Sequence, residues 1–306
     1  MLRYLVQRII QIVPVLLGVS IVVFAMLHMI PGDPAVIMAG EDASRETIQT
    51  IRESMGLDRP ITVQFTVFLG RLLRGDLGKS IRTKLPVAQE ITERYPYTAT
   101  MAVLATVLAS AVGIVAGVVA AVNRSSAIDT ISMVIALLGV STPSFWLGLM
   151  LMLVFALTLR WLPTVGASTP LHYIMPTLTL GAQSAGMIAR MSRSAMLEVI
   201  RQDYVRTARA KGLSERVVIY HHALKNALIP IVTIVGLRFG GLLAGTVLVE
   251  SVFNIPGIGR AMVDAVATRD YPMVQGTVLV VAASFVLVNT VVDLMYAFID
   301  PRIRFQ

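Results

Sequence analysis

The sequence contains no cysteine, so a disulfide framework, a thiolate metal site and a cysteine nucleophile are all excluded. Charged residues are scarce as well: Asp, Glu, Lys and Arg make up 14% of the 306 residues, whereas a soluble domain usually carries about a quarter. Hydrophobic residues account for 56% of the chain, and the mean hydropathy is +0.75. Water is therefore not the main solvent of this protein.

The hydrophobic residues gather into six long blocks, on the scale of the roughly 20 residues that cross a bilayer. Four blocks contain no charged residue, the fifth holds only Arg238 and the sixth only Asp293. The sequence therefore predicts an all-α integral membrane protein with six transmembrane helices. The blocks are residues 9–29, 98–122, 130–159, 174–189, 227–249 and 274–299.

Two of these blocks have unusual features. The first follows Arg3 and Arg8, as a signal peptide would, but it outruns a signal core of about 7–15 residues and lacks a small-residue cleavage site, so we expect a retained helix. The third is too long for one straight crossing, and Pro143 inside it removes a backbone donor. We expect a kink or break at Pro143, with strong tilt as the alternative.

The blocks divide the chain into an N-terminus with the first helix (1–30), an external subdomain (31–97), a five-helix core (98–299) and a C-terminal tail (300–306). Lys and Arg near helix ends stay preferentially in the cytoplasm. The loop between the fourth and fifth blocks is short and holds eight cations, so we expect that loop and both termini to be cytoplasmic. The net charge of +8 then reflects membrane topology and requires no nucleic-acid partner.

The external subdomain has helical signals of its own. Ser44 is a good N-cap for a helix in which Ile48, Ile51 and Met55 share one face. A second short helix is predicted over residues 64–73. Farther along, residues 250–275 form either a plain external loop or a partly re-entrant helix around residues 261–266, and the sequence leaves both open.

The polar loop at residues 198–230 is patterned throughout. Its apolar residues recur at helical spacing in two stretches, Leu197, Ile200, Tyr204 and Ala208, and then Leu213, Val217, His221 and Leu224. We expect the first helix to end near Gly212, because glycine tolerates the left-handed conformation that closes a helix. A second helix should begin at Ser214 and end before Pro230. Two short helices joined at a glycine form a rigid projection that fits a partner's groove.

Within this loop, TARAKG (207–212) and HALKNALIP (222–230) resemble the cytoplasmic EAA loop of the permease subunits of binding-protein-dependent ABC importers. The form is that of the dipeptide, oligopeptide, glutathione and nickel group. The general motif begins Glu-Ala-Ala where this chain has Arg206, Thr207 and Ala208, a departure that resembles the peptide group. The resemblance also extends to HMIPGDP (28–34), GDLGKS (75–80), WLPTVGA (161–167), IPGIGR (255–260), RDYPMVQG (269–276) and PRIR (301–304).

The resemblance implies an inner-membrane permease for dipeptides, oligopeptides or similar solutes such as glutathione, working by alternating access. Its partners would be a homologous second permease, two ATP-binding subunits and an external solute-binding protein. It implies no catalytic residue, no metal and no cofactor in this chain, since ATP and magnesium belong to the partner ATPases. By position, the residues that would form or brace the ATPase-coupling helix are Tyr204, Arg206, Thr207, Ala208, Lys211, Gly212, Leu213 and Glu215.

The intramembrane charges Arg238 and Asp293 are costly in hydrocarbon. They could form an ion pair with each other, contribute to the solute path, or lie near helix ends, and the sequence leaves these three readings open. Polar residues at membrane depth could also line the solute path or only pack between helices. The candidates for the path are Ser141, Thr142, Ser144, Gln183, Ser184, Arg238 and Asn289.

Other motifs favour no additional chemistry. GDLGKS ends like a phosphate-binding loop, but Leu73 stands where that motif needs its first glycine. The four histidines are scattered, and only His221 and His222 are neighbours, which point in different directions on a helix. Three GxxxG pairs predict close helix packing within the chain or against a second permease. They are Gly113 with Gly117, Gly236 with Gly240, and Gly241 with Gly245.

Three alternatives compete with peptide import. Nickel import is the main alternative substrate within the same family. A self-sufficient secondary transporter would use Arg238 and Asp293 as an ion relay and would be indifferent to ATP. An intramembrane enzyme would need an acid, base or metal cluster that the sequence does not display.

Overall fold

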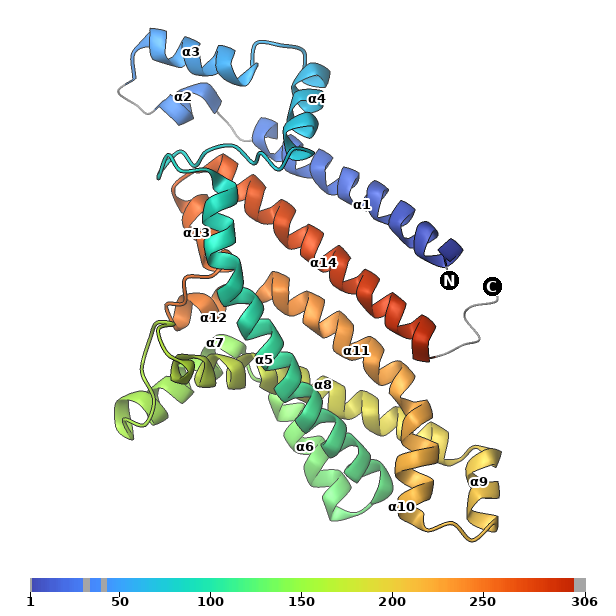
Figure 1. Ribbon diagram of the computed structural model, residues 1–306. Coiled ribbons are helices and arrows are strands. Elements are labelled where there is room, and N and C mark those ends of the chain that lie inside the picture. The colour runs from blue at the N-terminus through green and yellow to red at the C-terminus, as the bar shows by residue number, and fades with distance from the viewer. Residues whose placement is uncertain (1, 30–33, 40–42, 300–306) are drawn as a thin grey trace. The chain divides into compact units, whose positions relative to one another are not determined.

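The computed structural model describes residues 2–29, 34–39 and 43–299, and within these ranges the chain is helical, with no strand (Figure 1). The long helices cover all six predicted blocks. In chain order the elements are α1 (Leu2–Met29), α2 (Pro34–Ala39), α3 (Arg45–Met55), α4 (Ile61–Leu72), α5 (Val87–Val122), α6 (Ala127–Ser141), α7 (Ser144–Leu151), η1 (Met152–Thr158), η2 (Pro170–Tyr173), α8 (Ile174–Ile200), α9 (Asp203–Ala210), α10 (Glu215–Val217), η3 (Val218–Ala223), α11 (Leu224–Gly245), α12 (Val247–Val252), α13 (Ile258–Ala267) and α14 (Tyr271–Ile299).

Several of these helices are long and apolar enough to cross a membrane. Among the described residues, the stretches Val87–Val122, Glu215–Leu243 and Tyr271–Val292 qualify by length and composition, and a fourth span arises if α6 is taken together with α7 and η1. The apolar part of α1, Ile10–Met26, is shorter. The prediction of an all-α membrane protein is confirmed.

The third block is broken at the predicted proline. Helices α6 and α7–η1 are bent by 101° relative to each other at the Thr142–Pro143 step. Pro143 cannot donate a backbone hydrogen bond, and the last helical carbonyl before it, that of Leu138, accepts from both the amide and the hydroxyl of Thr142, at 3.0 and 2.7 Å. The expectation of a break is therefore confirmed.

The chain folds into two compact units. Of the described residues, unit 1 contains 97–256 and 285–299, and unit 2 contains 2–29, 34–39, 43–96 and 257–284. Helices α5 and α14 each contribute to both. The predicted boundaries at residues 30, 97 and 299 stay a prediction.

Helix α8 lies at the centre of unit 1, with α6 and α11 packed against it. Its backbone approaches its neighbours at glycines. A Cβ atom built on Gly117 of α5 would lie 2.4 Å from the carbonyl oxygen of Ala189, and one on Gly186 would lie 2.3 Å from that of Ala136 on α6. Such distances are far below van der Waals contact, so these helices pack through their backbones.

The GxxxG pairs therefore divide into two kinds. Gly113 and Gly117 contact α8, while Gly236 and Gly240 of α11 meet Val292 and Phe285 of α14, inside unit 1. Among the described residues, nothing lies within 4 Å of a Cβ built on Gly241.

Unit 1 also contains a fully buried carboxyl group, that of Glu250. Glu250 of α12 is fully buried, and its Oε1 accepts hydrogen bonds from the hydroxyls of Thr98 and Thr246, each at 2.7 Å. A buried polar group is tolerated only when it is hydrogen-bonded. Thr98 belongs to α5, so this bond ties α12 to α5.

Unit 2 contains the external subdomain predicted from the sequence. Ser44 caps α3, with its hydroxyl accepting from the amide of Thr47 at 3.1 Å, as predicted. The predicted second helix is α4, which begins three residues earlier than expected. Asp270, which precedes α14, accepts hydrogen bonds from the Ser80 hydroxyl and from the amide of Met273.

Two expectations about helix ends are wrong. Pro230 does not end the second helix of the loop, because it lies inside α11. Membrane helices tolerate an internal proline where neighbouring groups satisfy the freed carbonyl. The first stretch of the loop is not one helix either, because α8 ends at Ile200 and α9 begins at Asp203. The side chain of Asp293 and its suspected pairing with Arg238 lie outside the described residues.

We expect Gly117→Ala to destabilise the protein by about 1–3 kcal/mol, because the new methyl group would overlap the α8 backbone. Thermal unfolding in detergent, followed by intrinsic fluorescence, measures the effect as a midpoint lower by several degrees. Gly241→Ala is the matched control and should leave the midpoint unchanged or slightly higher. Equal midpoints for the two variants would contradict backbone packing at Gly117.

Candidate functional site

The candidate site is the segment from the end of α8 to the start of α11. The chain leaves α8 at Arg201 and re-enters a helix at Asp203, with Gln202 as the extended N-cap residue of α9. Helix α9 ends at Ala210, and Gly212 then adopts φ +79°, a left-handed conformation that favours glycine. The predicted glycine turn is present, but the helix after it continues through η3 into α11. Helix α9 lies beside the α10–η3 stretch (Figure 1).

A small apolar core holds the two helices together. Val205 and Ala208 of α9 pack with Val218 of η3, and Val199 of α8 lies against this cluster. All three central side chains are buried. The cluster includes residues from both sides of the turn. The segment from α9 to α10, residues 203–217, is therefore a folded element and not a loose loop, and it is called the α9–α10 projection below.

Two side-chain bonds close the projection. The Asn226 amide donates to the Tyr204 hydroxyl at 2.7 Å, which joins α9 to the first turn of α11. Arg209 and Glu215 form a bidentate pair across the glycine turn, with nitrogen–oxygen distances of 2.8 and 3.3 Å. Hydrogen bonding to Glu215 raises the pKa of the Arg209 guanidinium above its ordinary value. Both bonds are exposed, so each contributes modestly to stability but fixes the turn geometry.

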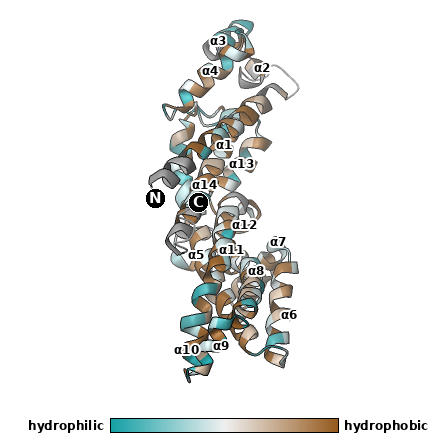
Figure 2. Cartoon of the chain, turned by 90° about the vertical axis from the view of Figure 1, so that its right-hand side faces the viewer, coloured by the Kyte–Doolittle hydropathy of each residue, from teal (hydrophilic) through white to brown (hydrophobic). Residues whose placement is uncertain are grey.

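The outer surface of the projection is polar and open. Arg206, Thr207, Lys211 and Gly212 are exposed, and Leu213 is 40% exposed. Figure 2 shows hydrophilic residues concentrated on α9 and α10. The face therefore combines positive charge with an exposed apolar side chain. A groove lined with acidic and apolar groups would complement it.

The projection rests on the body of unit 1 through a second apolar cluster. Met196 of α8, Ile219 and Ala223 of η3, and Ile231 of α11 pack with Val118 of α5. The cluster thereby links the projection to three long helices. Residues 218–223 form a π-helix, a geometry that is rare and concentrated at functional sites.

An ion pair braces α8 above the projection. The Arg193 guanidinium donates to both carboxylate oxygens of Asp129, at 2.6 and 2.7 Å. Asp129 is buried in the first turn of α6, and its Oδ2 also accepts from the amide of Ser125. The pair fixes the start of α6 against α8.

The structure spreads the predicted solute-path residues over several helices of unit 1. Ser184 is buried, whereas Gln183 beside it is exposed. The Arg238 side chain of α11 is half-buried and contacts the sulfur of Met187 on α8. The remaining candidates are Ser141 at the end of α6, Thr142 in the break, Ser144 at the start of α7 and Asn289 on α14.

One cavity of unit 1 is lined by residues other than the predicted solute-path residues. Its lining includes Thr100, Leu104, Ser168, Thr169 and Tyr173.

Sequence reasoning missed two residues that shape the projection. Arg209 and Asn226 make the bonds that close it. Arg209 and Glu215 are six residues apart, which is not a helical pairing distance, and Asn226 lies 22 residues after Tyr204. A signal for Asn226 is its position inside HALKNALIP, within the matching motif.

Two protein-family models match most of the chain. Residues 113–305 match the model of the binding-protein-dependent transport system inner membrane component, and residues 1–102 match that of the N-terminal region of such membrane components. The chain belongs to this permease family. The two matches together cover both units, and they confirm the resemblance carried by the loop motifs.

Relatives with named functions align with the permease from end to end. It is 47% identical to the glutathione transport system permease protein GsiC of Pectobacterium atrosepticum and 46% identical to the protein of that name from Escherichia coli, in each case over 100% of both chains. The permease is thus a multi-pass membrane protein of a transport system.

Solved structures share the permease fold. An inward-facing structure of the MetNI methionine ABC transporter aligns with a TM-score of 0.59 at 17% identity, covering 69% of this chain and 97% of the other. A second crystal form gives 0.56 at 19% identity, with coverages of 69% and 96%.

We expect Asp129→Asn to lower the stability of the permease by about 1–3 kcal/mol, since it leaves the Arg193 guanidinium without its buried charged partner. Chemical unfolding in detergent measures the loss. The matched control is Asp203→Asn, whose pair with Arg206 is 3.5 Å long and almost fully exposed, and which should change stability by less than about 0.5 kcal/mol. Comparable losses in both variants would show that the brace is unimportant.

Proposed function

We propose that this chain is one of two permease subunits of an ATP-driven importer, and that its α9–α10 projection is the site where an ATPase subunit engages. The observation that carries the proposal is the projection itself: a folded, cationic, exposed element whose base is packed against α5, α8 and α11. A groove on the partner that closes on ATP binding would move α9, and the apolar base would pass that movement to the membrane helices.

The coupling residues divide into two roles. Arg206, Thr207, Lys211 and Leu213 are exposed and contact the ATPase. Ala208 is buried, and Tyr204 and Glu215 make internal bonds, so these three keep the projection in shape. Gly212 supplies the turn between them. ATP and magnesium bind the partner subunits, and this chain serves as a non-catalytic gate.

The proposed solute is glutathione or a small peptide. Support comes from the end-to-end identity of 46–47% to proteins named as glutathione transport permeases. The path runs between this chain and a homologous second permease. Gln183, Arg238 and Asn289 supply polar groups to that path, whereas the burial of Ser184 favours a packing role.

The orientation proposed for the permease places both termini and the α9–α10 projection in the cytoplasm and unit 2's subdomain outside. The cations of the short loop support it. An external solute-binding protein then delivers the solute on the side of α3 and α4. Membership of a binding-protein-dependent family removes the reason to treat Arg238 and Asp293 as the ion relay of a self-sufficient transporter.

We expect Gly212→Asp to leave the permease inserted in the membrane but to abolish ATP-dependent uptake and co-purification with the ATPase subunits. Any residue with a Cβ is strained at φ +79°. A negative charge there would also reduce the positive charge of the face that is proposed to contact the ATPase. Gly75→Asp is the matched control: Gly75 has φ +74° and open space around it, yet it lies in unit 2. ATPase co-purification should persist in Gly75→Asp. Retention of the ATPases by Gly212→Asp would refute the coupling role.

We expect proteoliposomes that contain the permease with its co-purifying partners to accumulate labelled glutathione when ATP and the binding protein are present. Unlabelled dipeptides compete if the path accepts peptides in general, and nickel has no effect. Accumulation of nickel in place of glutathione would assign the alternative substrate. Uptake by the permease alone, without ATPase subunits, would contradict the proposed mechanism altogether.

A further inference from the structure

Helix α4 of unit 2 is apolar, yet it is not buried. Of its 12 residues, none is buried in the chain, and its only charged residue is Arg71 near the end. Ile61 is 56% exposed and Val67 is 38% exposed, and Leu73 immediately after the helix is 81% exposed. A contiguous exposed apolar surface of this kind often marks a contact with a partner protein or with the membrane.

The uncharged polar side chains in the middle of α4 do not require water either. The Gln64 amide donates to the backbone carbonyls of Leu57 and Arg59, at 3.2 and 2.8 Å. The Thr66 hydroxyl donates to the carbonyl of Val63 at 2.9 Å. These donor groups therefore already have acceptors within unit 2.

The helix packs on α1 through three aromatic rings. The ring of Phe24 lies 5.3 Å from that of Phe65 and 5.6 Å from that of Phe68, between centroids. Phe24 is five residues before the end of α1 at Met29, which corresponds to about 7–8 Å along the helix axis. Interfacial helices bury their apolar face to about 5–10 Å at the boundary of headgroups and acyl chains. The position of α4 on α1 matches this depth.

The exposed surface of α1 continues this environment. Val13 and Val22 of α1 are 62% and 60% exposed, as expected for side chains that face lipid. Because α1 and α4 are in contact within unit 2, the exposed apolar surface of α1 extends onto α4.

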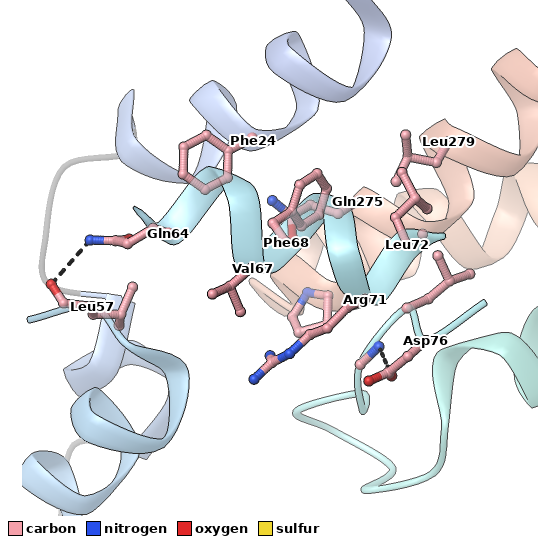
Figure 3. A pocket seen from close by; sticks show the side chains of 14 residues that line it. Phe24, Leu57, Gln64, Val67, Phe68, Arg71, Leu72, Asp76, Gln275 and Leu279 are labelled. Carbon is pink, nitrogen blue, oxygen red and sulfur yellow. Dashed lines mark hydrogen bonds between the residues drawn. The ribbon is translucent and has the colours of Figure 1, made fainter. Parts of the chain in front are cut away.

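A groove with a volume of about 100 Å³ lies along α4, and Phe24, Phe68, Leu72 and Leu279 form apolar parts of its wall. Figure 3 shows the Arg71 guanidinium directed away from Phe24. Within the part of the chain that the structure describes, this guanidinium has no hydrogen-bond or ion-pair partner. Arg74 is exposed in the turn that follows the end of α4. The nearby Asp76 carboxylate accepts from the amide of Gly78 at 2.9 Å, in its own loop.

We infer that α4 lies in the membrane interface and that its groove binds a phospholipid, with an acyl chain along Phe24, Phe68 and Leu279 and the phosphate at Arg71 and Arg74. Arginine pairs well with phosphate oxygens. Anionic phospholipid is preferred, because each arginine near the surface favours it. The side of the membrane follows the orientation proposed above, whereas the depth of α4 does not depend on it.

The depth is tested by spin labels, which suit this chain because it has no cysteine of its own. The full chain, with the partners that co-purify, is placed in nanodiscs of phosphatidylethanolamine and phosphatidylglycerol. Val67→Cys should favour oxygen over a nickel chelate as the relaxing agent, as a lipid-facing Val13→Cys label does. Thr50→Cys on the polar face of α3 is the aqueous control. A Val67→Cys label that is as accessible to nickel as that control, or shielded from both agents by protein, would overturn the inference.

The headgroup site is tested by lipid retention. Native mass spectrometry of the intact complex should show about a fivefold loss of bound phosphatidylglycerol for Arg71→Gln and for Arg74→Gln. Arg45→Gln, which removes an exposed cation from α3 in the same unit, should retain the lipid. Unchanged retention in the Arg71→Gln, Arg74→Gln double variant would show that the arginines do not hold the phosphate. Neither measurement requires transport, so failure here is separable from failure of the proposed function.

Discussion

The close approach of the α8 backbone to α5 and α6 is the contact on which the rest of unit 1 depends. In hydrocarbon there is no hydrophobic effect to drive helices together, so association relies on van der Waals contact and hydrogen bonds between them. Gly117 and Gly186 allow such contact, because each lies where a Cβ would overlap a neighbouring carbonyl oxygen. Helices held at this distance have few alternative registers. The three therefore behave as one block, to which the Asp129–Arg193 pair adds a polar brace.

The α9–α10 projection is packed against this rigid block. A coupling element at the end of a flexible loop would absorb a push from its partner. Here the projection is joined to α8 by two residues only, and its inner face is buried against Val199 and against the cluster around Met196. The π-helical turn at residues 218–223 lies between the projection and α11. It is the irregular section between the projection and the long helix that follows.

The sequence predicts the parts of this structure that follow from local chemistry. Long uncharged blocks required helices, Pro143 required a break, and Ser44 and Gly212 marked a helix start and a turn. The sequence did not reveal the gap between α8 and α9, because Ile200 and Tyr204 keep the helical spacing across it. Pro230 inside α11 was missed for the opposite reason, since surroundings that only the fold supplies allow a proline there.

The predicted solute path is the part that local chemistry describes least. Whether a polar residue at membrane depth faces a pathway or a neighbouring helix depends on the rotation of its helix, and Gln183 and Ser184 are adjacent yet face different environments. A further limit is that the path is proposed to form between two chains. The sequence and the structure of one permease show only the residues that this chain would contribute to such a path.

In α9, the buried side chains maintain the fold of the helix pair, whereas the exposed side chains are available to a partner. Ala208 is enclosed by Val205 and Val218, where any larger residue would force the two arms of the turn apart. Arg206 and Thr207 precede it in the motif and face outward. Folding therefore constrains the third position, while the first two are free to vary with the surface that receives them. A permease of this architecture could be matched to a different motor subunit by exchanging its outward side chains, without rebuilding the element that carries them.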